Sequence, residues 1–115
     1  MPHCVIEYTR NIEAEINISD LLGVAFEGVA SCGHFNREAI KARAIPFDIY
    51  KSGLDRDDYI HLKLRILSGR TPEQKKQISD HMIEQLIAHV GRTKSLTVEI
   101  IDMDIGSYGK YIAED

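Results

Sequence analysis

Hydrophobic and polar positions alternate along several stretches of this chain, a pattern that is typical of strands with one buried face. This alternation and the content of β-branched and aromatic residues predict four strands, at 3–8, 40–45, 59–67 and 96–103. In the second strand, Lys41 and Arg43 lie on the face opposite the apolar side chains. Pro46 is expected to end that strand, because proline has no N–H to donate to a sheet.

Two further stretches have the spacing of an amphipathic helix. The first is marked by apolar residues at intervals of three and four, Leu22, Ala25, Phe26 and Val29. Ser19 is its expected N-cap, and Gly33 is expected to end it in a left-handed conformation. The second helix begins after Thr71, which forms a capping-box sequence with Gln74, and Gly91 is expected to close it.

The elements follow the order β-α-β-β-α-β, which predicts one α+β domain over residues 1–115. Right-handed crossovers between parallel strands place both helices on one face of a four-stranded sheet. Residues 47–58 are expected to be an irregular or hairpin segment, because they contain Ser-Gly and several charged residues. Residues 104–115 contain two glycines and are expected to form a tail.

Composition argues against several classes of function. The chain of 115 residues has a net charge of −4, whereas a nucleic-acid-binding domain usually carries a basic stripe. No apolar run reaches the roughly 18–20 residues of a membrane helix, and the first residues lack the pattern of a signal peptide. Cys4 and Cys32 are too few for a disulfide framework and are expected to be free thiols. We therefore expect a cytoplasmic protein with no nucleic-acid or membrane partner.

Pro2 is the first candidate for chemistry. When the amino-terminal methionine is removed, as is usual before proline, Pro2 becomes a secondary amine at the start of a strand. An apolar pocket and nearby cations both disfavour the charged form of an amine, which brings its pKa toward neutrality. An amine with a pKa near neutrality takes and gives protons well. Many chains begin Met-Pro for other reasons, so the motif alone does not establish a catalyst.

Three cations can bind an anionic substrate. Lys41 and Arg43 project from one face of their strand, and Arg70 lies in the loop before the second helix. Together they can hold a dicarboxylate, since the planar fork of arginine accepts a carboxylate through two parallel hydrogen bonds. The alternative is that these charges lie on a solvated sheet face, which is their more usual role.

Metal binding and other catalytic motifs are not indicated. His81 and His89 are eight residues apart on one predicted helix, which is too far for a shared metal ion. The sequence contains no Gly-rich phosphate loop and no nucleophile elbow.

Short motifs along most of the chain match a known family. They are Met1-Pro2-His3, Glu7, Asn11-Ile12, the strand Ile40-Lys41-Ala42-Arg43, the strand His61-Leu62-Lys63-Leu64, and Gly69-Arg70. A chain with these residues in this order resembles the 5-carboxymethyl-2-hydroxymuconate isomerase family of the tautomerase superfamily. The resemblance spans roughly residues 2–103, is thin over 47–58 and is absent in the tail. The family pattern has an arginine at the position of Lys41.

The resemblance implies an enzyme that moves a proton along a conjugated enol to give the keto isomer, with Pro2 as acid–base catalyst. It implies no cofactor, and a role in the bacterial breakdown of aromatic acids. A homotrimer is implied as well, with active sites near the subunit boundaries. The sheet itself also predicts assembly, because its outer face is expected to carry Val5, Tyr8 and Ile101 beside charged residues.

Two other functions stay open at this stage. The first is a tautomerase for another enol, such as an arylpyruvate. The second is a non-enzymatic trimeric binding protein on the same scaffold, since fold does not fix function. An RNA-binding module is disfavoured by the acidic balance and by the lack of aromatic residues on the central strands.

Overall fold

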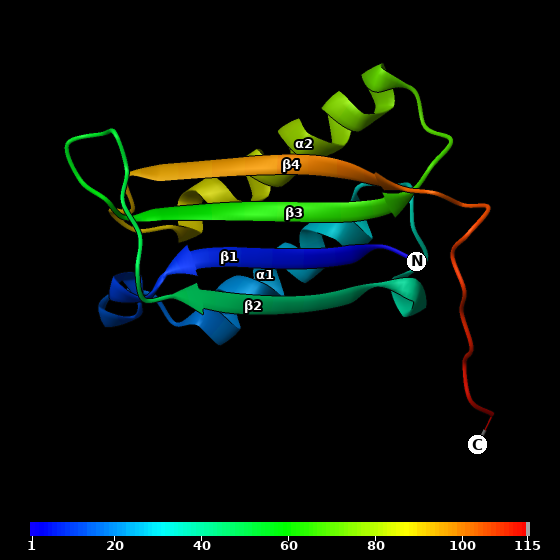
Figure 1. The fold of residues 1–115 in the computed structure, drawn as a ribbon, viewed down its shortest axis with the longest axis horizontal. Helices are drawn as coiled ribbons and strands as arrows, with labels where there is room; N and C mark the ends of the chain where they lie inside the picture. Colours follow the sequence, from blue (N-terminus) through cyan, green and yellow to red (C-terminus); the bar gives the residue numbers. More distant parts are fainter. Residues whose placement is uncertain (115) are drawn as a thin grey trace.

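Four strands form one mixed sheet in the order β2-β1-β3-β4 in the computed structural model, which describes residues 1–114 (Figure 1). Strand β1 (His3–Thr9) pairs in parallel with β2 (Lys41–Phe47) and antiparallel with β3 (Tyr59–Leu67). Strand β4 (Ser95–Met103) pairs in parallel with β3 and forms the other edge of the sheet. The predicted strands are confirmed, and β3 has the predicted bounds.

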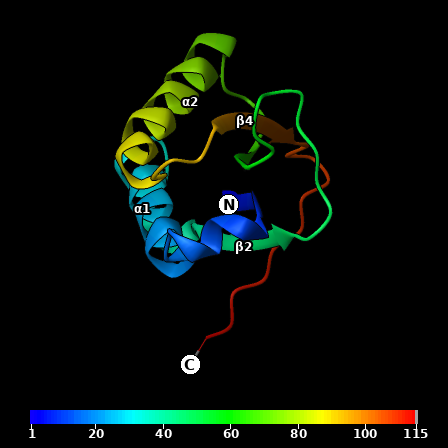
Figure 2. The same ribbon diagram turned by 90° about the vertical axis from the view of Figure 1, so that its left-hand side faces the viewer.

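Two helices cover one face of this sheet (Figure 2). Helix α1 (Ile18–Ser31) connects β1 to β2, and helix α2 (Pro72–Leu86) connects β3 to β4. The predicted β-α-β-β-α-β order and the α+β class are thereby confirmed. Single 3-10 turns at Arg10–Ala14, Arg37–Ala39 and Ile87–His89 complete the connections. Within the described residues, no helix is long and apolar enough to span a membrane.

The core lies between the sheet and the two helices. Strand β3 supplies the side chains of Ile60, Leu62, Leu64 and Ile66, each at most 1% exposed. The helices complete the core with Leu21, Ala25 and Val29 of α1 and Ile78, Met82 and Leu86 of α2. Removing this much apolar surface from water is the main force that holds the helices on the sheet.

Helix α1 begins earlier than predicted. Its N-cap is Asn17, whose side chain accepts a hydrogen bond from the N–H of Asp20 at 3.1 Å, so the prediction of Ser19 is wrong. Asn17 has an extended backbone and lies one residue before the first helical position, the geometry in which a side chain reaches the first free N–H groups. The buried stripe of this helix contains Leu21, Ala25 and Val29, whereas Leu22 and Phe26, predicted to belong to it, are only partly buried.

Helix α2 begins as predicted. The Thr71 hydroxyl accepts from the N–H of Gln74 at 3.1 Å, and the Gln74 side chain accepts from the N–H of Thr71 at 2.9 Å. The α-helix ends at Leu86, and a 3-10 turn follows before Gly91, which has a φ of +55°. Gly91 cannot be replaced without strain, because a Cβ there would also meet the Glu15 carboxylate at 2.5 Å.

Two predictions for the strands are wrong. Strand β2 continues through Pro46, which lies opposite Tyr8, and ends at Phe47. Proline is tolerated because β2 is an edge strand with no neighbour on its outer side. Tyr8 belongs to the core beneath the helices rather than to the outer face, and its hydroxyl donates to the Glu13 carboxylate at 2.6 Å. Val5 and Tyr8 are three positions apart, and residues whose positions differ by an odd number point to opposite faces of a strand.

The segment between β2 and β3 forms an irregular loop, as expected. Its backbone is held by its own side chains: the Ser52 N–H donates to the Asp57 carboxylate at 3.0 Å, and the Leu54 N–H to the Ser52 hydroxyl at 3.2 Å. Residues 104–114 contain no helix or strand, in agreement with the predicted tail. Asp115, the last residue of that prediction, lies outside the described residues.

Candidate active site

Pro2 lies at the end of the sheet where β1 and β2 begin and where β3 and β4 end (Figure 1). Its side chain is fully buried. Its carbonyl accepts a hydrogen bond from the N–H of Lys41 at 3.0 Å, which extends the β1–β2 pairing by one step. The position of Pro2 is therefore determined by the sheet, and the residues that follow the other strands reach the same end.

The amino terminus lies among cations from three separate segments. Partial burial lowers the pKa of the Met1 amino group, and the charges of Lys110, Arg70 and Lys41 lower it further. The structure thus brings Lys41 and Arg70, two of the predicted substrate-binding residues, to the amino terminus. Lys110 comes from the predicted tail. A cation nearby disfavours a second positive charge, so an amine at this place holds its proton weakly.

Arg43, the third predicted substrate-binding residue, contacts the neighbouring strand. Its Nη1 donates to Nδ1 of His3 at 3.2 Å. A guanidinium only donates, so Nδ1 of His3 is the acceptor and the ring proton lies on Nε2. That nitrogen reaches the Tyr108 hydroxyl at 2.8 Å. Burial, and then the charge of Arg43, lower the pKa of His3, so the imidazole is neutral at pH 7.

Arg70 is held in a defined orientation. Its Nη2 donates to the carbonyl of His34 at 3.0 Å, and Nη1 to the carbonyl of Leu67 at 3.5 Å. The guanidinium stacks over the ring of Phe35 at 4.6 Å from the centroid. A guanidinium has five N–H donors, so donors remain for an anion after these two contacts.

The sequence patterns did not identify every residue of this site. Lys110 and Tyr108 fall in the segment that was predicted only as a tail, and His3 was noted only within the Met-Pro-His motif. No periodicity or spacing indicates Tyr108, because it meets His3 from 105 residues away along the chain. Only the path of the chain after β4 brings it there.

Two other candidate nucleophiles, Ser31 and Cys4, lack an activating environment. The Ser31 hydroxyl lies 3.1 Å from Nε2 of His81, but this nitrogen also lies 3.0 Å from the carbonyl of Gly28. A carbonyl can only accept, so Nε2 carries the proton and cannot take one from Ser31. Burial raises the pKa of Cys4 to about 12, which keeps it as an unreactive thiol.

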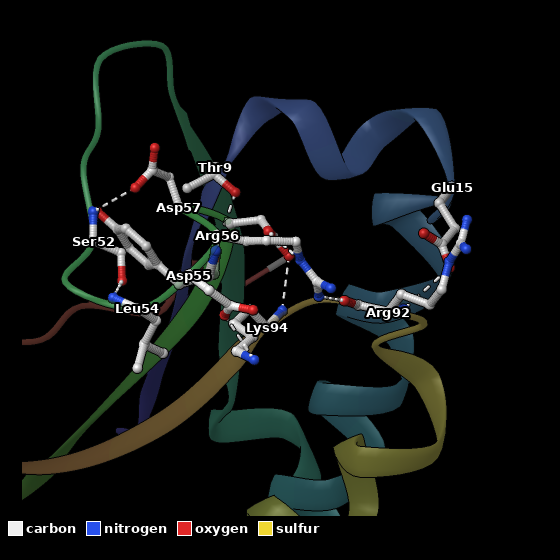
Figure 3. A network of polar contacts seen from close by, with 11 residues as sticks. Thr9, Glu15, Ser52, Leu54, Asp55, Arg56, Asp57, Arg92 and Lys94 are labelled. Atoms are coloured by element: carbon white, nitrogen blue, oxygen red, sulfur yellow. Dashed lines mark hydrogen bonds and ion pairs between the residues drawn. The ribbon is translucent and has the colours of Figure 1, made fainter.

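Across the part of the chain that the structure describes, no three His, Cys, Asp or Glu side chains gather as metal ligands would. A cavity of about 350 Å³ lies at the opposite end of the sheet. Figure 3 shows the polar contacts of Glu15, Arg56 and Arg92, three of the residues that line it. Its charged lining is paired: Arg56 lies 3.2 Å from the Asp58 carboxylate, and the N–H of Arg92 donates to Glu15 at 3.1 Å. These charged groups are paired with one another in contacts that hold loops together. The end of the sheet with Pro2 is therefore the better candidate for a catalytic site.

Comparisons with known proteins agree on one family. The model of the family described as 5-carboxymethyl-2-hydroxymuconate isomerase matches residues 2–107. A relative from Escherichia coli, 5-carboxymethyl-2-hydroxymuconate Delta-isomerase, is 28% identical over 91 residues, which cover 77% of this chain and 72% of the relative.

Solved structures share the fold, and one of them carries the same family name. One is the crystal structure of a 5-carboxymethyl-2-hydroxymuconate isomerase from Deinococcus radiodurans R1. The match covers 96% of this chain and 88% of the Deinococcus chain, with 27% sequence identity and a TM-score of 0.76. A structure titled as a fused 4-OT wild-type symmetric trimer shares the fold at 13% identity and a TM-score of 0.75, over 94% of this chain and 90% of its own. This chain belongs to the 5-carboxymethyl-2-hydroxymuconate isomerase family.

Proposed function

We propose that this isomerase converts a conjugated enol with two or three carboxylates, such as 5-carboxymethyl-2-hydroxymuconate, to its keto isomer, and that Pro2 is the acid–base catalyst. Family membership supports the class of reaction. The observation that carries the assignment to Pro2 is the meeting of Lys41, Arg70 and Lys110 at the amino terminus. A proton-transfer group and the charges that attract its anionic substrate then occupy one place.

The proposed chemistry needs a free Pro2 nitrogen. Removal of Met1 turns that nitrogen from an amide into a secondary amine with a lone pair. The cations that lower the pKa of the Met1 amino group also disfavour the ammonium form of Pro2, so the pKa of the Pro2 amine is expected to lie below that of a free proline amine. The neutral amine takes the proton of the enol, and the ammonium returns a proton to a carbon of the same conjugated system, which leaves a carbonyl and a shifted double bond.

In the proposed binding mode, different cations bind different carboxylates of the substrate. Arg70, stacked on Phe35, presents its remaining N–H groups to one carboxylate. Arg43 and Lys41, on the outer face of β2, hold a second. Lysine keeps the charge but lacks the fork of arginine, so Lys41 contributes attraction rather than a fixed geometry.

We also propose that the protein is a homotrimer. Large apolar side chains are exposed on β2 and the loop after it, including Ile49, which is 95% exposed, together with Ile45 and Leu54. An exposed apolar surface of this kind is typical of an interface. The sedimentation mass at micromolar concentration is expected to be that of three chains. A mass of one chain under these conditions would show that the outer face is solvated and not covered.

The compartment that we propose is the cytoplasm. Cys4 and Cys32 are both free cysteines in the structure, and Cys4 is fully buried. Free thiols are usual in a reducing compartment, where disulfides are rare. Extracellular export would expose Cys32, which is partly accessible, to oxidation.

The experiment that tests the function measures loss of enol absorbance in the ultraviolet with two substrates. One is 5-carboxymethyl-2-hydroxymuconate, and the other is the enol of an arylpyruvate, which has one carboxylate. We expect kcat/KM to be larger for the first by about 10- to 100-fold, the effect of one charge-assisted anchor. Equal values of kcat/KM for the two substrates would show that the cations do not determine the specificity. No turnover of either enol would contradict the proposed function.

A further inference from the structure

The contacts of Tyr108 point to a role for the C-terminal segment in substrate binding. We infer that Tyr108 and His3 are positioning residues: the hydrogen-bonded series Arg43–His3–Tyr108 orients the Arg43 guanidinium for an anionic substrate and holds residues 104–110 beside the site. This inference rests on the proposed function. Neither Tyr108 nor His3 needs to exchange a proton with the substrate in this role.

The series has one consistent arrangement of donors and acceptors. Arg43 donates to Nδ1 of His3 at 3.2 Å, and the proton on Nε2 of His3 points to the Tyr108 hydroxyl at 2.8 Å. The edge of one ring also meets the face of the other, with centroids 6.2 Å apart and planes at 63°. A neutral imidazole can form both hydrogen bonds at once, whereas a protonated one cannot accept from Arg43.

The C-terminal segment reaches this point because it is attached to the end of the sheet. After β4 the N–H of Ile105 donates to the Ser68 hydroxyl at 3.1 Å, and the N–H of Ser107 closes a turn on the carbonyl of Asp104 at 3.2 Å. From there the chain runs past the amino terminus (Figure 1). The contact of Tyr108 with His3 is thus the second attachment of this segment, and Lys110 follows Tyr108 by two residues.

The charges around His3 explain why a histidine suits this position. Arg43 and Lys41 of β2, Arg65 of β3 and the amino terminus all lower its pKa, after the larger effect of burial. The imidazole therefore stays neutral, and the contact with Arg43 is present, at all pH values above this lowered pKa. As the pH falls through the lowered pKa, His3 gains a proton, repels Arg43 and releases it.

The test begins with Tyr108→Phe and its matched control, Tyr111→Phe. Both remove one hydroxyl from the same segment, but Tyr111 is 86% exposed and its hydroxyl has no hydrogen bond within the described residues. We expect Tyr108→Phe to raise KM about 3- to 10-fold with kcat unchanged, the effect of one hydrogen bond. Tyr111→Phe is expected to leave both constants unchanged.

A second variant, His3→Asn, separates the two contacts of the ring. The amide oxygen of asparagine occupies the place of Nδ1 and can accept from Arg43, while the contact with Tyr108 is lost. We expect the KM of His3→Asn to equal that of Tyr108→Phe, and the double variant to show no further rise, as for residues that act in series. The KM of the wild type is expected to rise at acidic pH as His3 protonates, and that of His3→Asn is not.

Two results would overturn the inference. In the first, Tyr108→Phe and Tyr111→Phe have the same KM. In the second, Tyr108→Phe lowers kcat alone, which would make Tyr108 a catalytic group.

Readouts that do not need turnover distinguish this inference from the proposed function. The affinity for the muconate dianion is measured by calorimetry, and nitrogen NMR of labelled histidine reports the tautomer of His3. We expect the proton on Nε2 in the wild type, and weaker muconate binding in Tyr108→Phe than in Tyr111→Phe. A proton on Nδ1, or equal affinities, would refute the positioning role. An inactive wild type that meets both expectations would refute only the proposed function.

Discussion

Protein that retains Met1 on every chain is expected to lose isomerase activity by about 10²- to 10⁴-fold, the usual contribution of general acid–base catalysis. In the retained form the Pro2 nitrogen is an amide, whose lone pair is delocalised into the carbonyl and cannot take a proton. Acetylation of the processed terminus is expected to have the same effect. Mass spectrometry reports the state of the terminus, and ultraviolet absorbance follows the conversion of enol to keto.

The control for this prediction is Pro2→Ala, which keeps an amine after processing but changes its basicity and rigidity. Its activity is expected to lie between those of the native and the blocked proteins. Circular dichroism of all forms is expected to be the same, because Met1 lies outside the sheet. If the blocked protein turns over at the full rate, Pro2 is not the catalyst.

The pH profile gives a second readout of the same group. A general base must be neutral, so kcat/KM is expected to rise with pH through an apparent pKa. Burial and the charges of Lys110, Arg70 and Lys41 all lower the pKa of an amine here, so this apparent pKa is expected to lie below that of a free proline amine.

Arg70→Ala is expected to have the second largest effect, a rise in KM of about 10- to 100-fold. The guanidinium of Arg70 is already oriented by Phe35 and by the carbonyl of His34, so little freedom is lost when it binds a carboxylate. The substitution also removes a cation beside the amino terminus. The apparent pKa of the catalytic amine is therefore expected to rise, which moves the pH profile to higher pH.

Arg92→Ala is the matched control for Arg70→Ala. It removes the same charge at the opposite end of the sheet, where the Arg92 side chain is 89% exposed. We expect it to leave KM and the pH profile unchanged.

Arg43→Ala is expected to raise KM as Arg70→Ala does. Unchanged KM values in both Arg43→Ala and Arg70→Ala would show that these arginines are ordinary solvated charges.

Local patterns in the sequence determined most of the fold. The alternation at 59–67 predicted β3 correctly, because the side chains of any strand point to opposite faces in turn. The capping box of Thr71 and Gln74 was predictable because it lies within four consecutive residues. The Met-Pro start, the charges on one strand and the cation in the loop before the second helix predicted a site of Pro2, Lys41, Arg43 and Arg70. The charges of Lys41 and Arg70 both act on the amino terminus.

The tertiary structure decided those features that depend on contacts between one element and its neighbours. Pro46 stays in a strand because β2 is an edge of the sheet, and Leu21 rather than Leu22 faces the core because the helix docks on its neighbours in that orientation. Tyr108 and Lys110 reach the amino terminus because β4 ends at the same end of the sheet and Ser68 holds the chain that follows. Contacts between residues 105 positions apart leave no local pattern, since they depend on how the whole sheet is assembled.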